Sequence, residues 1–190
     1  NSVLLPLANC SRTVNKDFTA NTGTLSLDFK PTDHVMAYLT ARRGYRAGGF
    51  NMRAQSDVQF QPFKPEFVDD LELGLKADWN VGGWQFRTNM ALFNQKYKDV
   101  QRTVSTVNAS NNVVTVIRNA AKAKIDGGEF EGTIAPTQNF QLRINYTHLN
   151  AKYDEYLDPT ATNPALRDLS TTPFSFTPSN SGSVAVLYTL

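Results

Sequence analysis

The segment LELGLKADWNVGGWQFRTNMALFNQKY, residues 71–97, decides the fold. From Leu71 to Trp79 it places an apolar residue at every second position, with charged or small residues between, and the alternation resumes at Trp84. Successive side chains of an extended chain point to opposite faces, so this pattern predicts two β-strands, each with an apolar and a polar face. The tight turn NVGG (80–83) joins them as a hairpin.

The same alternation continues along the chain. In residues 140–151, Phe, Leu, Ile and Tyr alternate with Gln, Arg, Asn and Thr. No segment shows the three- and four-residue apolar spacing of an amphipathic helix. The sequence therefore predicts an all-β fold, an antiparallel meander of about seven strands, over residues 23–29, 34–43, 67–79, 84–107, 113–135, 140–151 and 182–190.

The predicted connections fall into short turns and long segments. Short turns are expected at 30–33, 80–83 and 136–139, whereas 44–66 and 152–178 are long and irregular. Consecutive antiparallel strands place alternate connections at opposite ends of a sheet. One end of this sheet therefore has short turns, and the other end has long loops. This asymmetry is typical of transmembrane β-barrels of the outer membrane, which have short periplasmic turns and long extracellular loops.

Alternation alone does not distinguish a barrel in lipid from a soluble β-sandwich. Three features favour the barrel: charges in mid-strand on the polar face, the long strands, and Trp79 and Trp84 at a short turn, where an aromatic girdle would lie. A cross-strand contact in an ordinary hairpin is the alternative for the two tryptophans. Bacterial barrels have an even number of strands, so we expect about seven strands to form part of a larger barrel.

Composition and motifs argue against several other classes of protein. The 190 residues carry 19 Lys and Arg against 17 Asp and Glu, and a net charge of +2 is too small for a nucleic-acid footprint. His34 and His148 lack the spacing of a zinc site, and Asp69 and Asp70 point to opposite faces of a strand. We therefore expect no enzyme activity, no metal, no cofactor and no nucleic-acid partner.

Cys10 is the single cysteine of the chain, so no intrachain disulfide is expected. Its context, LLPLANC, faintly resembles a lipobox, although no basic segment precedes it, and an inert loop cysteine is the alternative. The chain starts without Met and stops within a predicted strand, which suggests a segment of a longer protein.

Four blocks of sequence resemble, in order, the barrel domain of TonB-dependent outer-membrane receptors. They are GTLSLDFKPTDHVMAYLTARRGYRAGGFN (23–51), PEFVDDLELGLKADW (65–79), NMALFNQKYKDVQ (89–101) and NAAKAKIDGGEFE (119–131). The best-matching positions are Gly44, Tyr45, Arg46, Gly48, Gly49, Phe50, Asn51, Pro65, Glu66, Glu72, Leu73, Gly74, Leu75, Lys76, Tyr97, Asp99, Gln101, Asn119, Ala120, Gly128, Glu129 and Glu131.

This resemblance implies a transmembrane β-barrel of about 22 strands, of which residues 1–190 are a part from the second half. The family's plug domain, its TonB-engaging segment and its closing C-terminal strand are not visible in this sequence. The implied function is active uptake, in the outer membrane of a Gram-negative bacterium, of a scarce extracellular small molecule such as a ferric siderophore. The implied partners are the TonB energy-transducing complex, reached through the plug domain, and outer-membrane lipid and lipopolysaccharide. A passive porin-type channel and a soluble all-β binding module are the alternatives.

Physical roles can be assigned to three groups of residues. Gly44, Gly48 and Gly49 are expected to allow a bulge or a positive φ where a strand leaves the wall, and a phosphate-binding loop is a weaker alternative. Arg42, Arg43 and Arg46 are expected to contact lipopolysaccharide phosphates or an anionic substrate, or else to form a solvated rim. Glu72, Lys76, Glu129 and Glu131 are expected to face the lumen, where they pair with plug residues or across neighbouring strands. Substrate would bind at the long segments 44–66 and 152–178.

Overall fold

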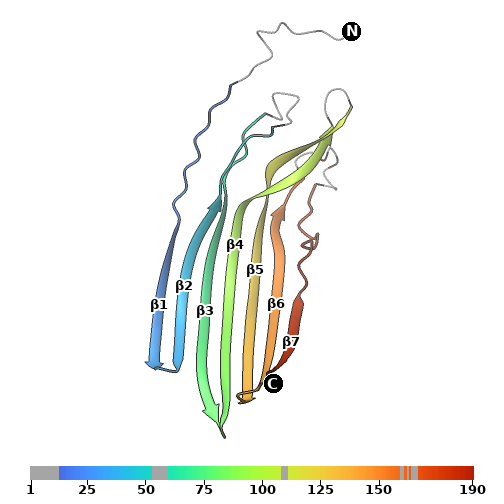
Figure 1. The fold of residues 1–190 in the computed structure, drawn as a ribbon. Helices are drawn as coiled ribbons and strands as arrows, with labels where there is room; N and C mark the ends of the chain where they lie inside the picture. Colours follow the sequence, from blue (N-terminus) through green and yellow to red (C-terminus); the bar gives the residue numbers. More distant parts are fainter. Residues whose placement is uncertain (1–12, 53–59, 108–110, 159–160, 162, 164–166) are drawn as a thin grey trace, which may run out of the picture.

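In the computed structural model, the chain forms one antiparallel sheet whose seven strands follow the order of the sequence (Figure 1). The structure describes residues 13–52, 60–107, 111–158, 161, 163 and 167–190. Within this part of the chain, no helix is long and apolar enough to cross a bilayer. The strands are β1 (Gly23–Thr32), β2 (Val35–Arg46), β3 (Glu66–Val81), β4 (Trp84–Val107), β5 (Val113–Thr137), β6 (Phe140–Tyr156) and β7 (Asn180–Tyr188).

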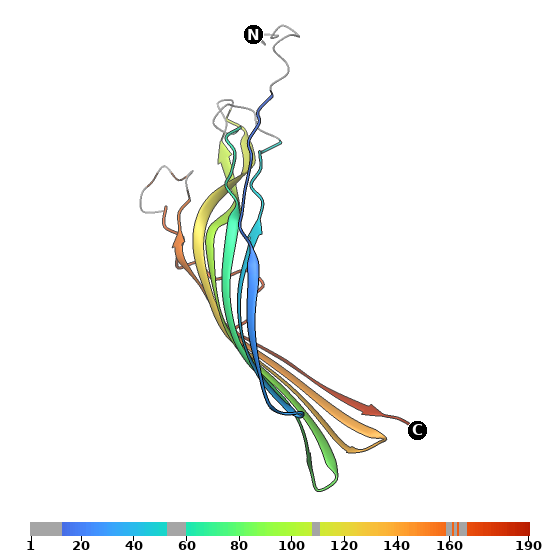
Figure 2. The ribbon, with the colours of Figure 1, turned by 90° about the vertical axis from the view of Figure 1, so that its left-hand side faces the viewer.

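The predicted meander of seven strands is confirmed, and the sheet is not closed. It curves strongly along the strands, as Figure 2 shows. Strands β1 and β7 are its two edges. Cys10, whose context faintly resembles a lipobox, lies outside the described residues.

The turn between β3 and β4 forms where NVGG predicts it, and it consists of two residues, Gly82 and Gly83. Their φ values are 58° and 85°. Positive φ at both central residues is the signature of a type I′ turn, whose twist matches that of the flanking strands. Glycine adopts this conformation without a steric cost, so the local sequence fixes the register of the hairpin.

The first turn lies further along the chain than the sequence predicted. Residues 30–32 belong to β1, and only Asp33 and His34 separate β1 from β2. The ladder is irregular between Phe29 and Thr32, a segment that contains Pro31. Proline has no N–H to donate to a ladder and occurs in sheets at edges and bulges, so strand and proline coexist here.

The hairpin of β4 and β5 extends well beyond its neighbours at the loop end of the sheet (Figure 1). These strands have 24 and 25 residues, and they pair as far as Val107 and Val113. The ladder shifts register beside Asp99, whose φ is 54°. Above that bulge Val104 and Val116 are buried. A buried cluster of Ala121, Ala123 and Tyr153 lies nearby. The buried apolar residues of the described chain are therefore concentrated at the loop end.

Candidate functional site: the two faces of the sheet and the base of the loops

One face of the sheet is apolar across all seven strands. The register aligns Leu27, Leu39, Leu73 and Leu92 in one row, directly cross-strand from one another. Neighbouring rows continue the face onto the later strands with Phe130, Ile134, Leu142, Ile144, Val184 and Val186. These side chains are exposed to solvent: the exposed fraction is 70% for Leu27, 54% for Leu73 and 64% for Leu92. A large exposed apolar surface of this kind marks a face that contacts lipid or protein.

The apolar face has the height of a membrane. Leu71 and Val81 bound it on β3. The ten steps between these two residues, at about 3.3 Å each and tilted by about 40°, span about 25 Å, which is the height of the apolar band of a transmembrane barrel. At the turn end, the Phe86 ring lies 5.1 Å from that of Trp79 and 6.4 Å from that of Trp84. The tryptophans therefore lie at the edge of the apolar band, in the position predicted for a girdle.

The opposite face carries the charged residues that the sequence placed there. Glu72 accepts hydrogen bonds from the Tyr38 hydroxyl (2.7 Å) and from the Arg42 guanidinium. Glu131 accepts one from Asn89 Nδ2 at 3.2 Å. The Lys76 ammonium lies 5.6 Å from the centre of the Tyr38 ring. In these contacts the predicted residues bind other side chains on adjacent strands rather than one another. Glu129 lies on the same face, since it is two residues from Glu131 on β5.

The predicted arginine cluster is divided between the two faces. Arg42 bonds the buried Asp70, from its Nε to Oδ2 at 2.7 Å, on the polar face. Arg43 and Asp69 are one residue further along and form an ion pair of 3.4 Å on the other face. Arg46 shares the face of Arg42 and is directly cross-strand from Glu66. The three arginines therefore do not form one anion-binding surface, and Asp69 and Asp70 point apart as predicted.

Two glycines on the polar face lie beneath aromatic rings of the neighbouring strand. Tyr38 is cross-strand from Gly74, and a Cβ at Gly74 would come within 2.1 Å of the ring. Phe93 is cross-strand from Gly127, where a Cβ would come within 2.4 Å of the ring. Aromatic rings that cover glycines protect the ladder and hold these side chains flat on the sheet.

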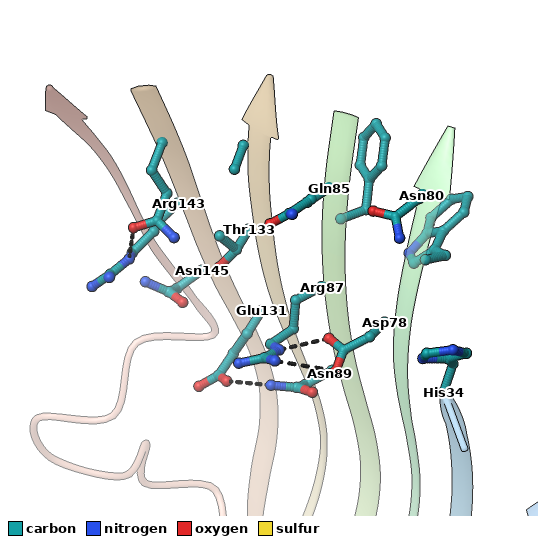
Figure 3. Close-up of a pocket in the computed structure, with 14 residues that line it drawn as sticks. His34, Asp78, Asn80, Gln85, Arg87, Asn89, Glu131, Thr133, Arg143 and Asn145 are labelled. Atoms are coloured by element: carbon teal, nitrogen blue, oxygen red, sulfur yellow. Dashed lines mark hydrogen bonds and ion pairs between the residues drawn. The ribbon is translucent and has the colours of Figure 1, made fainter. Parts of the chain in front are cut away.

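An open, polar hollow of about 780 Å³ lies on the polar face near the turn end (Figure 3). Arg87 donates two hydrogen bonds to Asp78, of 2.7 and 3.1 Å, and Asn89 and Glu131 lie beside this pair (Figure 3). The other labelled residues are His34, Asn80, Gln85, Thr133, Arg143 and Asn145. Sequence reasoning placed several of these on the polar face but did not identify a hollow, because the hollow depends on the curvature of the sheet.

A network of hydrogen bonds at the loop end joins the segment after β2 to the β4–β5 hairpin. Asn51 exchanges two hydrogen bonds with the backbone of Ile117, of 2.6 and 3.2 Å. Asn119 accepts from the Lys64 N–H at 2.6 Å and donates to the carbonyls of Lys64 (2.9 Å) and Asp99 (2.7 Å). Three separate blocks of the family resemblance therefore meet at one place.

Gln101 and Glu66 complete this loop-base network. Gln101 Nε2 donates to the carbonyls of Ala47 and Lys64, at 2.9 and 3.1 Å, and its N–H donates to Glu66 Oε2 at 2.8 Å. Gln101 is buried, so these bonds replace those that water would make. The network identifies a structural role for residues that the sequence marked only as matches to a family.

A bulge or a positive φ was expected at Gly44, Gly48 and Gly49. Positive φ does not occur at these three positions, since in the described chain only Gly82 and Gly83 are glycines with positive φ, and the β2–β3 ladder has no register shift at Gly44. A Cβ on Gly48 would lie 2.4 Å from the Phe63 carbonyl oxygen, and one on Gly49 would lie 2.8 Å from the Phe63 ring. Gly49 and Phe63 also exchange backbone hydrogen bonds of 3.2 and 2.9 Å. The close Phe63 carbonyl at Gly48 and the close Phe63 ring at Gly49 therefore leave no room for a side chain at either position. Gly44 instead continues β2, opposite Val68.

Four further positions of the family resemblance lie near the loop-base network or on the apolar face. Tyr45 stacks with Phe67 at 6.4 Å on the face of Arg43, and Phe50 lies 6.1 Å from Phe60. Pro65 immediately precedes β3. Gly128 lies on the apolar face, cross-strand from Leu92.

The segment between β6 and β7 packs against the polar face near the loop end. Its Phe174 ring stacks on Tyr153, with ring centres 4.1 Å apart and planes at 17°. The Arg102 guanidinium lies 5.4 Å from the centres of both the Tyr153 and Tyr156 rings. Elsewhere in this segment, hydrogen bonds from Ser170 lower the pKa of the Asp168 carboxyl. Within the described residues, no group of His, Cys, Asp and Glu is arranged to hold a metal.

Two comparisons with known proteins add to this geometry. Residues 5–190 match a family model described as TonB dependent receptor-like, beta-barrel. The fold is similar to that of the ferric yersiniabactin uptake receptor FyuA from Yersinia pestis, with a TM-score of 0.64 and 21% sequence identity. That match covers 87% of this chain and 22% of the receptor, so the chain spans about a fifth of the length of that solved structure.

Proposed function

The chain belongs to the TonB-dependent receptor family as a segment of its β-barrel, and from this premise we propose that the whole protein imports a scarce, bulky solute such as a ferric siderophore. The family is one of receptors and transporters of the Gram-negative outer membrane. The solved structure with a similar fold is a receptor for the uptake of ferric yersiniabactin, which supports a chelated metal as the class of solute.

The observation that carries this proposal is the two-faced sheet. Its apolar face is exposed and as tall as the apolar band of a transmembrane barrel, while the other face has charged side chains joined in hydrogen bonds and ion pairs. In a membrane barrel the apolar face contacts lipid and the polar face lines a wet interior. A soluble domain would instead need a second layer of protein over the apolar face.

The polar hollow around Arg87 and Asp78 fits the proposed interior. We expect it to contact the plug domain, whose movement, driven by TonB, admits the solute. Exposed polar groups such as Asn145 and Arg143 are available there for hydrogen bonds with a second domain. The loop-base network holds residues 47–52 and 60–66 at the opposite end of the barrel, where an extracellular solute would first bind.

The proposal is tested by uptake in cells. A strain that lacks the full-length protein is given a panel of radiolabelled ferric siderophores under iron limitation. We expect uptake of one member to be lost, to return with the full-length gene, and to be abolished when TonB is deleted. Flux that persists without TonB would instead indicate the passive channel.

The soluble alternative has its own test. Residues 1–190, expressed without detergent, are expected to aggregate because the apolar face has no cover. A monodisperse monomer that unfolds cooperatively in plain buffer would contradict the assignment of that face to lipid.

A further inference from the structure

The β4–β5 hairpin continues past its neighbours as an arm, formed by residues 101–107 of β4 and 113–120 of β5 (Figure 1). At the loop end, β3 pairs with β4 only as far as Lys98, and β6 pairs with β5 only as far as Ala121. Within the described chain, no strand pairs with the outer edges of the arm beyond these two residues. A two-stranded hairpin is at best marginally stable alone in water, so other contacts must hold the arm in position.

The arm begins where the ladders on both sides of β5 are irregular. The β4–β5 ladder shifts register beside Asp99, whose φ is 54°. The β5–β6 ladder shifts register between Lys122 and Ala123. Bulges bend a strand and interrupt its hydrogen bonds. The ladder below therefore does not by itself fix the direction of the arm.

The β2–β3 segment, described over residues 47–52 and 60–65, makes one of the contacts that hold the arm. Asn51 exchanges hydrogen bonds of 2.6 and 3.2 Å with the backbone of Ile117. Ile117 is cross-strand from Thr103, and its N–H and C=O point away from β4, since both bond Asn51. The Asn51 amide thus occupies the free edge of β5 in place of a strand residue.

The end of β6 holds the arm through Arg102. The Arg102 guanidinium donates a hydrogen bond to the Tyr153 hydroxyl and lies 5.4 Å from the centres of both the Tyr153 and Tyr156 rings. At the foot of the arm, the Leu157 N–H also donates to the Ala120 carbonyl at 2.9 Å. Contacts of a guanidinium with two aromatic faces fix its plane, so Arg102 holds the direction of the arm as well as its distance from β6.

The β6–β7 segment, in its residues 167–179, packs on the same two tyrosines. Phe174 stacks on Tyr153, with ring centres 4.1 Å apart. The Leu169 N–H donates to the Tyr156 carbonyl at 2.7 Å. The tyrosines that bind the arm are therefore also the ones that position this segment.

We propose that the arm couples the β2–β3 segment to the β6–β7 segment. Both segments hold the same arm, so freeing one of them lets the arm move and weakens the contacts of the other. Two sites that stabilise one element are linked, and the linkage is equal in both directions. The inference rests on the proposed function only in assigning solute to these segments: a solute that fixes one segment then also orders the other.

The test measures amide hydrogen exchange in the full-length receptor in detergent, without solute. Asn51→Ala removes the contact of the β2–β3 segment with the edge of the arm. We expect the Leu169 amide, in the other segment, to exchange about tenfold faster, as is usual for coupled sites. The control is Asn139→Ala, which also removes a side-chain hydrogen bond to a backbone carbonyl, but at the turn end. It should leave Leu169 at its wild-type rate.

Arg102→Gln tests the opposite direction. It removes the charged planar group that contacts the two tyrosines. We expect the Gly49 and Phe63 amides, which bond each other in the β2–β3 segment, to exchange faster by a similar factor. Lys152→Gln is the control, because it removes a positive charge next to Tyr153 on the other face of β6. It should leave both amides unchanged.

Acceleration in only one direction, or in neither, would overturn the proposal, because thermodynamic coupling is reciprocal. So would acceleration that also reaches the Leu75 amide in the middle of β3, since a general loss of stability would then account for the result. Should Arg102→Gln fail to fold, judged by loss of heat-modifiable migration on gels, Arg102→Lys replaces it. Lysine keeps the charge but not the planar contact with both rings, so the Gly49 and Phe63 amides should again exchange faster. No solute or TonB takes part, so failure here is distinct from failure of the proposed uptake.

Discussion

At the scale of single residues, alternation in the sequence predicted which face each side chain occupies but not which partner it binds. Glu72 and Lys76 were assigned correctly to the polar face, yet Glu72 bonds Tyr38 and Arg42, and Lys76 lies beside the Tyr38 ring. Partners depend on the register between strands that are distant in sequence. The three arginines were grouped by their nearness in sequence, although alternation within β2 alone places Arg43 on the face opposite Arg42 and Arg46.

Gly74 provides a prediction at this scale. A methyl group there would lie 2.1 Å from the Tyr38 ring, so Gly74→Ala must displace the ring and its 2.7 Å hydrogen bond to Glu72. We expect a loss of stability of about 1–3 kcal/mol, as for other overpacked sites. The measurement is the midpoint of heat-dependent gel migration of the full-length protein. Gly23→Ala, with no atom within 4 Å of the new Cβ, is the control. An equal effect of both variants would contradict the prediction.

Gly82, in the turn between β3 and β4, provides a second prediction at the scale of single residues. Its φ of 58° suits Gly and Asn but not a β-branched residue. Gly82→Val should destabilise the β3–β4 turn by about 1–2 kcal/mol, whereas Gly82→Asn should be close to neutral. Denaturant midpoints of the two variants give the comparison. The turn would have to be reassigned if valine were tolerated as well as asparagine.

At the scale of elements, the sequence predicted the seven strands and the long β4–β5 hairpin because periodicity and turn residues are local signals. It placed the first turn too early, since Pro31 suggested a break where the structure has an irregular ladder. It also identified Asn51, Gln101 and Asn119 without predicting that they meet. Their hydrogen bonds join segments as many as 66 residues apart, and a single sequence contains no signal for such contacts.

The loop-base network gives a prediction for one of these residues. Asn119→Ala removes hydrogen bonds to the backbone of Lys64 and Asp99 and should destabilise the loop base by about 1–3 kcal/mol. Hydrogen exchange of the Gly49 and Phe63 amides, which pair next to this network, is the measurement. We expect faster exchange at these amides.

Asn139→Ala is the matched control for this prediction. Asn139 also donates a hydrogen bond to a backbone carbonyl, that of Thr189 at 2.8 Å, but it lies at the turn end. Exchange at Gly49 and Phe63 should be unaffected. If Asn119→Ala left their exchange rates at the wild-type values, the network would not be what holds the loop.

At the scale of the whole molecule, the decisive property is the environment of each face. Spin labels at Leu73 and Leu75 in the full-length protein, reconstituted in bilayers, should be accessible to oxygen and shielded from a water-soluble nickel complex. Labels at Glu72 and Lys76 should show the reverse, because a polar lumen holds water. If the accessibilities were the opposite, the polar face would contact lipid and the apolar face would contact water, and the proposed function would lose its basis.

The order of the strands in the sheet also bears on how the sheet folds. Each strand contacts the strands before and after it in the chain, and every pairing is antiparallel. Contacts between chain neighbours need little loop closure, so each hairpin can be added to the one already formed without waiting for distant segments. We therefore expect these seven strands to pair one hairpin at a time, and the pairing of the exposed edges of β1 and β7 with other strands to come later.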